Sequence, residues 1–199
     1  MNIMVAIWKA VIDLNQTDIT NYINYFKCLE NDLLNTARYA EPIGQNDVYS
    51  FEYYKIIMLA CSEVETIFKL ICKKINSHSN PKKITDYAEI VLEKYPLIID
   101  TEVNVSRVCE TIKPFADWSA DKCMFWWDEH QDIKHNRHTD FRKATYKNAM
   151  YSLAGLYVLL LYLLKIYDQD IFIGSDYFYN IAERQILSCG APGKLPDFL

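Results

Sequence analysis

The apolar run at residues 153–164, LAGLYVLLLYLL, constrains the fold most strongly. Apolar side chains occupy every face of such a helix, so it must be covered nearly all round, by the rest of its own chain or by a second subunit. A membrane-spanning helix needs about 20 apolar residues. Because this run is shorter and is flanked by Asn148, Ser152 and Lys165, the sequence favours a helix at the centre of a bundle over a membrane span.

Helical spacing of apolar residues predicts the elements that would surround this helix. A first helix is expected to begin at Thr17 or Asp18, which both suit the N-cap position. A second follows Ser50, and its apolar positions step by three and four over about six turns, as in a coiled-coil seam. A shorter third helix should end before Pro96, because proline cannot continue a helix.

The apolar run is predicted to lie in a long helix from about residue 141 to residue 167, with Thr139 or Asp140 as its N-terminal cap. Residues 98–112 alternate apolar and polar positions in places, which allows a small extended segment. Only 5 Gly and 6 Pro in 199 residues favour helices over a turn-rich sandwich. We therefore expect one domain over residues 1–199 with an all-α fold, an up-and-down bundle of about four or five helices.

The charge of the chain limits what it can bind. It has 21 basic and 26 acidic residues, a formal charge of −5. Bulk electrostatics therefore argue against wrapping by nucleic acid, and any phosphate contact should be confined to a local basic cluster. The six cysteines form no CxxC pair and the first residues lack the pattern of a secretory signal, which favours reduced thiols in the cytoplasm.

The densest basic cluster lies in WWDEHQDIKHNRHTDF, residues 126–141, which is predicted to be a polar segment between two helices. It holds three of the four histidines, His130, His135 and His138. HEXXH is absent and no acidic ligand is placed by the pattern, so we expect no metal site. Neither a Gly-rich phosphate loop nor a nucleophile elbow occurs in the chain, and we expect no cofactor.

Three segments, taken in order, resemble proteins of the HEPN superfamily of helical-bundle domains. They are FEYYKIIMLACSEVETIFKLIC, WWDEHQDIKHNRHTDF and ATYKNAMYSLAGLYVLLLYLL. The likeness covers residues 50–167 and leaves the tail, residues 168–199, unassigned. It implies a homodimer with its polar motif at the dimer cleft, and a metal-independent endoribonuclease in a defence or toxin–antitoxin system. RNA or a nucleotide would be its ligand and an antitoxin its protein partner, with no membrane involved.

The match is partial, because only Lys134, His135 and Arg137 fit the Lys-His-x-Arg variant of the family motif, and no arginine precedes a histidine at the usual spacing. Metal-free RNA cleavage needs a base that titrates near neutral pH and a cation for the phosphoryl oxygens. The expected catalytic residues are His135, Arg137 and His138, and the expected phosphate-binding residues are Lys134, Asn136 and Arg142. A helix beginning at Thr139 or Asp140 would add backbone N–H groups.

Three other interpretations remain open, and the first is that the segment binds phosphate or nucleic acid without cleaving it. The segment is a solvated interhelical turn if its histidines stack on neighbouring aromatic rings and its cations pair with nearby acids. In that case Lys134 and Arg137 would pair with Asp128, Glu129, Asp132 and Asp140. Alternatively, the protein is a non-catalytic dimerising interaction module. In either case Trp126 and Trp127 are more often core or dimer anchors than platforms for bases.

Overall fold

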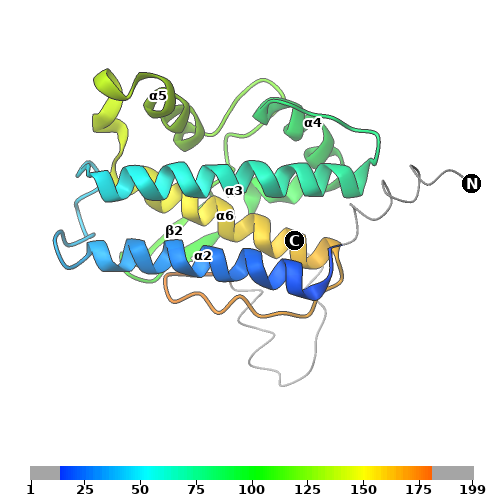
Figure 1. The fold of residues 1–199 in the computed structure, drawn as a ribbon, viewed down its shortest axis with the longest axis horizontal. Coiled ribbons are helices and arrows are strands. Elements are labelled where there is room, and N and C mark those ends of the chain that lie inside the picture. The colour runs from blue at the N-terminus through cyan, green and yellow to red at the C-terminus, as the bar shows by residue number, and fades with distance from the viewer. Residues whose placement is uncertain (1–13, 181–199) are drawn as a thin grey trace, which may run out of the picture.

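The computed structural model describes residues 14–180, which are mostly helical with one small sheet (Figure 1). The α-helices are α2 (Gln16–Thr36), α3 (Phe51–Ile75), α4 (Ile84–Lys94), α5 (Phe125–Asp140) and α6 (Tyr146–Ile166). Two 3-10 turns, η1 (Pro96–Asp100) and η2 (Phe141–Lys143), precede the sheet and α6 respectively. The strands are β1 (Val103–Val105), β2 (Glu110–Ile112) and β3 (Phe178–Tyr179).

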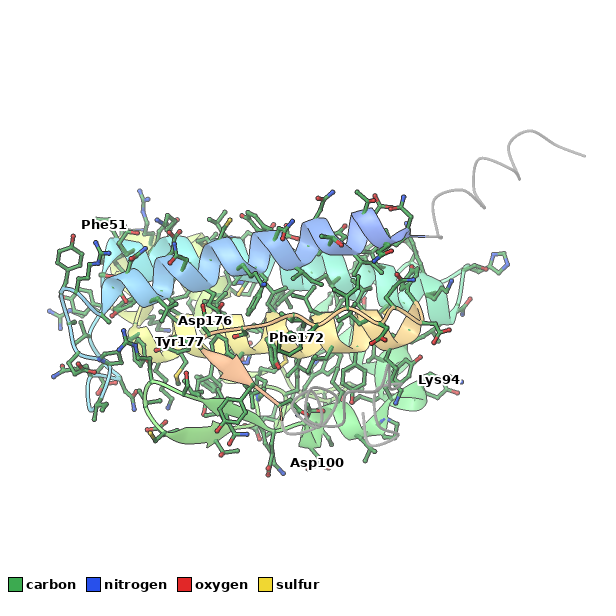
Figure 2. The ribbon with its side chains drawn as sticks, turned by 90° about the horizontal axis from the view of Figure 1, so that it is seen from below. Phe51, Lys94, Asp100, Phe172, Asp176 and Tyr177 are labelled. Carbon is green, nitrogen blue, oxygen red and sulfur yellow. The ribbon has the colours of Figure 1, made fainter. Side chains whose placement is uncertain are left out.

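Helix α6 is the core of the described part of the chain. In this part it alone is long and apolar enough to cross a membrane, and 83% of its most apolar window is buried inside the protein. Helices α2 and α3 pack along it, while the sheet lies on another side, as Figure 2 shows from below. The predicted central helix is therefore confirmed. Its own chain supplies the cover, so burial of α6 does not require a second subunit.

The start of α6 differs from the expected one. Its N-cap is Thr145, whose hydroxyl accepts a hydrogen bond from the Asn148 N–H at 3.2 Å. The predicted caps, Thr139 and Asp140, instead lie in the last turn of α5. The prediction was wrong because Thr139 bonds back to the carbonyl of Asn136, at 3.0 Å, and the 3-10 turn η2 separates the two helices.

The other helix boundaries agree more closely with the sequence. Ser50 caps α3, accepting from the Tyr53 N–H at 3.1 Å. Helix α2 begins slightly before the expected residues, because Asn15 and Asp18 form a reciprocal capping box. Helix α4 ends before Pro96, as expected.

The segments that precede α3 and α6 are joined side by side. The Ser50 N–H donates to the Ala144 carbonyl at 3.2 Å, and the Tyr146 N–H donates to the Val48 carbonyl at 2.8 Å. Tyr49 and Thr145 form an isolated antiparallel bridge between these bonds. Helices α3 and α6 therefore start together at one end of the bundle and run in the same direction (Figure 1).

The sheet has the order β2-β1-β3 with antiparallel pairing throughout. Strands β1 and β2 confirm the small extended segment expected within residues 98–112. Strand β3 lies in the tail, residues 168–199, which the sequence left unassigned, and it pairs Tyr179 with Asn104. Residues 181–199 lie outside the described residues.

Candidate functional site on helix α5

The segment that the sequence placed between two helices is itself helical. Helix α5 covers Phe125–Asp140, and its backbone departs from helical geometry only at Asn136, where φ is −129° and ψ is 40°. Lys134 and His135 therefore precede a kink, while Arg137 and His138 follow it. The predicted polar turn is replaced by a kinked helix with a buried side and an exposed side.

The buried side of α5 is structural. Trp126, Trp127, His130 and Ile133 point into the core. The indole N–H of Trp126 donates to the Pro114 carbonyl at 2.7 Å, which satisfies its only polar atom. Both tryptophans thus act as core anchors, and neither is available as a platform for stacking bases.

His130 is separated from the other two histidines by burial. Its side chain is 4% exposed and its ring packs edge-on against Trp127, with centroids 5.2 Å apart. Burial lowers the pKa of His130 to about 4, with Lys134 and His135 acting in the same direction and Glu65 opposing them. His130 is therefore neutral at pH 7 and fits a core position. Within residues 14–180, no group of three His, Cys, Asp or Glu side chains is arranged to hold a metal ion.

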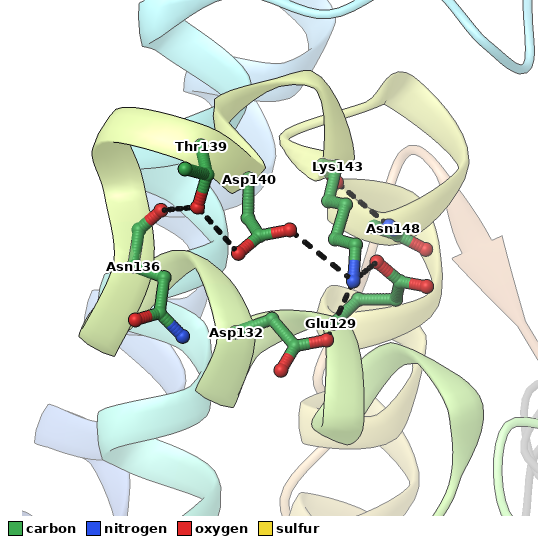
Figure 3. Close-up of polar contacts among 7 residues, drawn as sticks. All are labelled: Glu129, Asp132, Asn136, Thr139, Asp140, Lys143 and Asn148. Atoms are coloured by element: carbon green, nitrogen blue, oxygen red, sulfur yellow. Dashed lines mark hydrogen bonds and ion pairs between the residues drawn. The ribbon is translucent and has the colours of Figure 1, made fainter.

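Lys143 gathers the acidic side chains of this region (Figure 3). Its ammonium Nζ lies 2.6 Å from a carboxylate oxygen of Asp132, 3.6 Å from one of Glu129 and 3.6 Å from one of Asp140. The hydrogen bond to Asp132 is the main cause of the raised pKa of Lys143. The η2 turn thus places the ammonium group of Lys143 beside the acidic side chains of α5. The backbone carbonyl of Lys143 also accepts a hydrogen bond from the Asn148 amide at 2.7 Å.

The remaining cations of the region have no such partners. Lys134, Arg137 and Arg142 are exposed, and none forms an ion pair among the described residues. The expected alternative, in which Lys134 and Arg137 pair with nearby acids, is therefore not seen. Three of the four acids named for that role lie around Lys143 instead. Arg137 has a different neighbour, because its guanidinium carbon lies 5.7 Å from the centre of the Tyr54 ring.

The chain matches no protein-family model, no curated protein and no solved structure.

An aromatic cluster lies beside these cations and was missed as a site feature. Phe141 is its centre, with ring centroids 4.6 Å from Phe51, 5.8 Å from Tyr49 and 6.3 Å from Tyr54. Phe51 is 71% exposed and Tyr49 is 45% exposed. The run YSFEYY at residues 49–54 is the sequence signal, but its closeness to α5 depends on the joined starts of α3 and α6.

The predicted catalytic histidines are exposed and unsupported by neighbours. His135 and His138 make no hydrogen bond to any residue in the range 14–180, and Asn136 contributes its backbone carbonyl, not its side chain, to a hydrogen bond. The helix N-terminus expected at Thr139 or Asp140 does not exist there, so it supplies no anion site. What the arrangement offers is a set of accessible cations and imidazoles beside exposed aromatic rings.

Proposed function

We propose that the protein binds RNA through the exposed cations of α5 and η2, Lys134, Arg137 and Arg142, and through the aromatic cluster beside them. The observation that carries this proposal is the position of Lys143. The carboxylates of Asp132, Glu129 and Asp140 lie around Lys143. Among the described residues they form no ion pair with the neighbouring cations, which therefore stay accessible to a ligand. Contacts between such cations and phosphate supply most of the affinity of proteins for nucleic acid.

The aromatic cluster favours an RNA with unpaired bases. Phe51 presents most of its ring to solvent, next to Phe141 and Tyr49. Bases stack on such rings only when they are splayed out of a duplex, and each stacked base contributes about 1–3 kcal/mol. Arg137, held over Tyr54, lies where the backbone of such a strand would need a cation.

The same site would also cleave the bound RNA if its histidines are catalytic, which is the catalytic form of the proposal. His135 and His138 would transfer protons, Arg137 would stabilise charge on the phosphoryl oxygens, and Lys134, Asn136 and Arg142 would hold the phosphate backbone. The likeness to HEPN bundles supports this form, together with a homodimer, a cytoplasmic location and a defence or toxin–antitoxin role with an antitoxin as partner. The missing Arg-to-His spacing and the unsupported imidazoles favour binding over turnover.

A second candidate is a dimerising interaction module without catalysis. Exposed large side chains favour a protein contact near the start of α3. Those between the end of α2 and the first residue of α3 are Tyr39, Ile43, Tyr49 and Phe51. Light scattering distinguishes the two. The interaction module is supported if the protein binds no RNA, forms a dimer, and dimerises more weakly when Phe51 is replaced by Ser.

Fluorescence anisotropy with a labelled single-stranded RNA and its duplex tests the RNA proposal. The wild type should prefer the single strand. The combined variant Lys134→Gln/Arg137→Gln/Arg142→Gln should bind at least about tenfold more weakly and show a smaller dependence on salt. The control Lys82→Gln removes an exposed cation that belongs to neither helix and should change nothing. No binding by the wild type, or an equal loss in the control, overturns the proposal.

Incubation of tRNA and total RNA in EDTA tests the catalytic form separately. His135→Ala and Arg137→Ala should each abolish cleavage if these residues carry it, while His78→Ala, an exposed loop histidine, should not. Binding without cleavage by the wild type refutes the nuclease and leaves the RNA-binding proposal intact.

A further inference from the structure

A cavity of about 370 Å³ lies at the end of α2, on residues that the RNA proposal does not use. Its walls come from the last turns of α2, the loop that follows and the turn between β1 and β2. The lining residues are Leu34, Asn35, Ala37, Arg38, Glu41 and Arg107. Segments far apart in the sequence thus meet around an open pocket whose volume is near the lower limit for small-ligand pockets.

Two arginines dominate the charge of this cavity. Arg38 comes from the end of α2 and Arg107 from the β1–β2 turn, and neither forms an ion pair within the described part of the chain. Glu41 is the one carboxylate in the lining, which leaves the walls with a net charge of +1, from two arginines and one glutamate. Guanidinium groups bind phosphate through paired, charge-assisted hydrogen bonds, so unpaired arginines facing one cavity favour a phosphate.

A chain of hydrogen bonds through Tyr177 ties the β1–β2 turn, which carries Arg107, to helix α2. Glu30 on α2, only 3% exposed, accepts from the Tyr177 N–H at 3.0 Å. The Tyr177 carbonyl accepts from the Ser106 N–H at 2.9 Å, and Ser106 precedes Arg107. Figure 2 shows Tyr177 beneath α2, where the tail passes the bundle. This linkage ties the turn that carries Arg107 to α2, the helix that ends just before Arg38, and it uses neither guanidinium.

The other walls suit the organic part of a phosphate ester. Leu34 and Ala37 offer an apolar surface to a ring, while Asn35 and Glu41 can accept hydrogen bonds from hydroxyl or amino groups. We propose that this cavity binds a small phosphate monoester of the size of a nucleoside monophosphate, with Arg38 and Arg107 on the phosphate. The site shares no residue with the cations of α5 and does not depend on RNA binding.

Isothermal titration calorimetry of the full chain with AMP, inorganic phosphate and adenosine tests the site. AMP should bind, phosphate should bind more weakly, and adenosine should give no heat. Arg38→Gln and Arg107→Gln should each lower the affinity for AMP at least about tenfold, since each removes charge-assisted hydrogen bonds. Arg142→Gln, an exposed arginine outside the cavity, should have no effect. Thermal melts should be unchanged in all three variants because these side chains are exposed.

Glu41→Gln gives a second, independent readout. It removes the only negative charge of the lining and keeps a carbonyl acceptor, so it should tighten the binding of both inorganic phosphate and AMP. Absence of AMP and phosphate binding at millimolar concentration overturns the proposal. So does an equal loss of AMP binding in Arg142→Gln, which would place the ligand on α5, or adenosine binding as tight as AMP.

Discussion

The indole of Trp126 lies directly against the backbone of Gly155. A Cβ atom on Gly155 would lie 2.8 Å from Cζ2 and 3.0 Å from Cη2 of that ring. Because the Trp126 N–H is bonded to Pro114, the ring cannot move away without losing that bond. Gly155→Ala should therefore lower the free energy of unfolding by about 1–3 kcal/mol, measured by urea denaturation, as overpacking of a well-filled core does.

A double-mutant cycle separates this clash from the effect of alanine on the helix. The smaller ring of Trp126→Phe should make Gly155→Ala less costly, so the two changes should couple by at least about 0.5 kcal/mol. Additive effects would show that the close approach of ring and backbone does not limit this site.

His130 should make the protein acid-sensitive. Its pKa is lowered to about 4 in the folded chain, first by burial and then by Lys134, against an ordinary value of 6.5. The unfolded chain therefore binds the extra proton first, and the stability from this group is fully present above pH 6.5 and lost as pH falls toward 4. The loss between pH 7 and pH 5 should be about 2 kcal/mol.

Chemical denaturation of the wild type and of His130→Gln at these two pH values measures this contribution. Both proteins share every other titrating group, so the difference between their pH dependences isolates His130. His78→Gln, at an exposed loop position, serves as the control and should follow the wild type. If the free energy of unfolding of His130→Gln depends on pH as that of the wild type does, His130 is not the source of the acid sensitivity.

Glu30 should hold the tail to the bundle. Its carboxylate accepts from the Ser175 hydroxyl and from the N–H groups of Asp176 and Tyr177, at 3.4 and 3.0 Å for the latter two. Glu30→Gln puts an amide donor in front of these donors, which should cost about 1–3 kcal/mol. Amide hydrogen exchange of Tyr177 should become faster.

Asp32→Asn is the matched control for Glu30→Gln. Asp32 lies on the same helix, but its partner is Lys55, at 3.3 Å, on an exposed surface. Its replacement should leave the exchange of Tyr177 unchanged, and any loss of stability should stay below about 1 kcal/mol. If both variants accelerate exchange equally, the carboxylate of Glu30 is not the attachment point.

Lys143 should matter for both stability and RNA affinity. Lys143→Gln leaves Asp132, Glu129 and Asp140 without their shared cation, so the C-terminal half of α5 should be destabilised by about 1 kcal/mol. The released carboxylates should also weaken RNA binding a few-fold at low salt, with the effect fading as salt screens it. Lys147→Gln, whose ammonium lies 5.0 Å from the centre of the Phe125 ring, is the control. Equal affinities in both variants would contradict the role given to Lys143.

The parts of the fold that follow from periodicity were predictable. Apolar spacing located α2, α3 and α6, and Ser50 marks the start of α3 as expected. Helix α5 was predicted as a turn because its exposed half, from Lys134 to Thr139, has no apolar residue to mark a helical period. Thr139 and Asp140 looked like caps because the same side chains that begin a helix can also bond back to the end of one.

The candidate sites were less predictable because their neighbours come from distant segments. The basic residues of α5 were identified from the sequence. Their lack of acidic partners was not, because it depends on the η2 turn, which places Lys143 against Asp132. Phe51 reaches Phe141, at the start of η2, because the segments that precede α3 and α6 are paired. Arg38 and Arg107 share no motif, and only the folded chain brings them into the lining of one cavity.

The Lys143 contacts also change what the total charge of the chain means. A formal charge of −5 describes an average over the whole surface. Around α5 three carboxylates share one lysine, while Lys134, Arg137 and Arg142 are exposed and form no ion pair among the described residues. An approaching phosphate therefore meets cations that no carboxylate has paired, on a protein that is acidic as a whole.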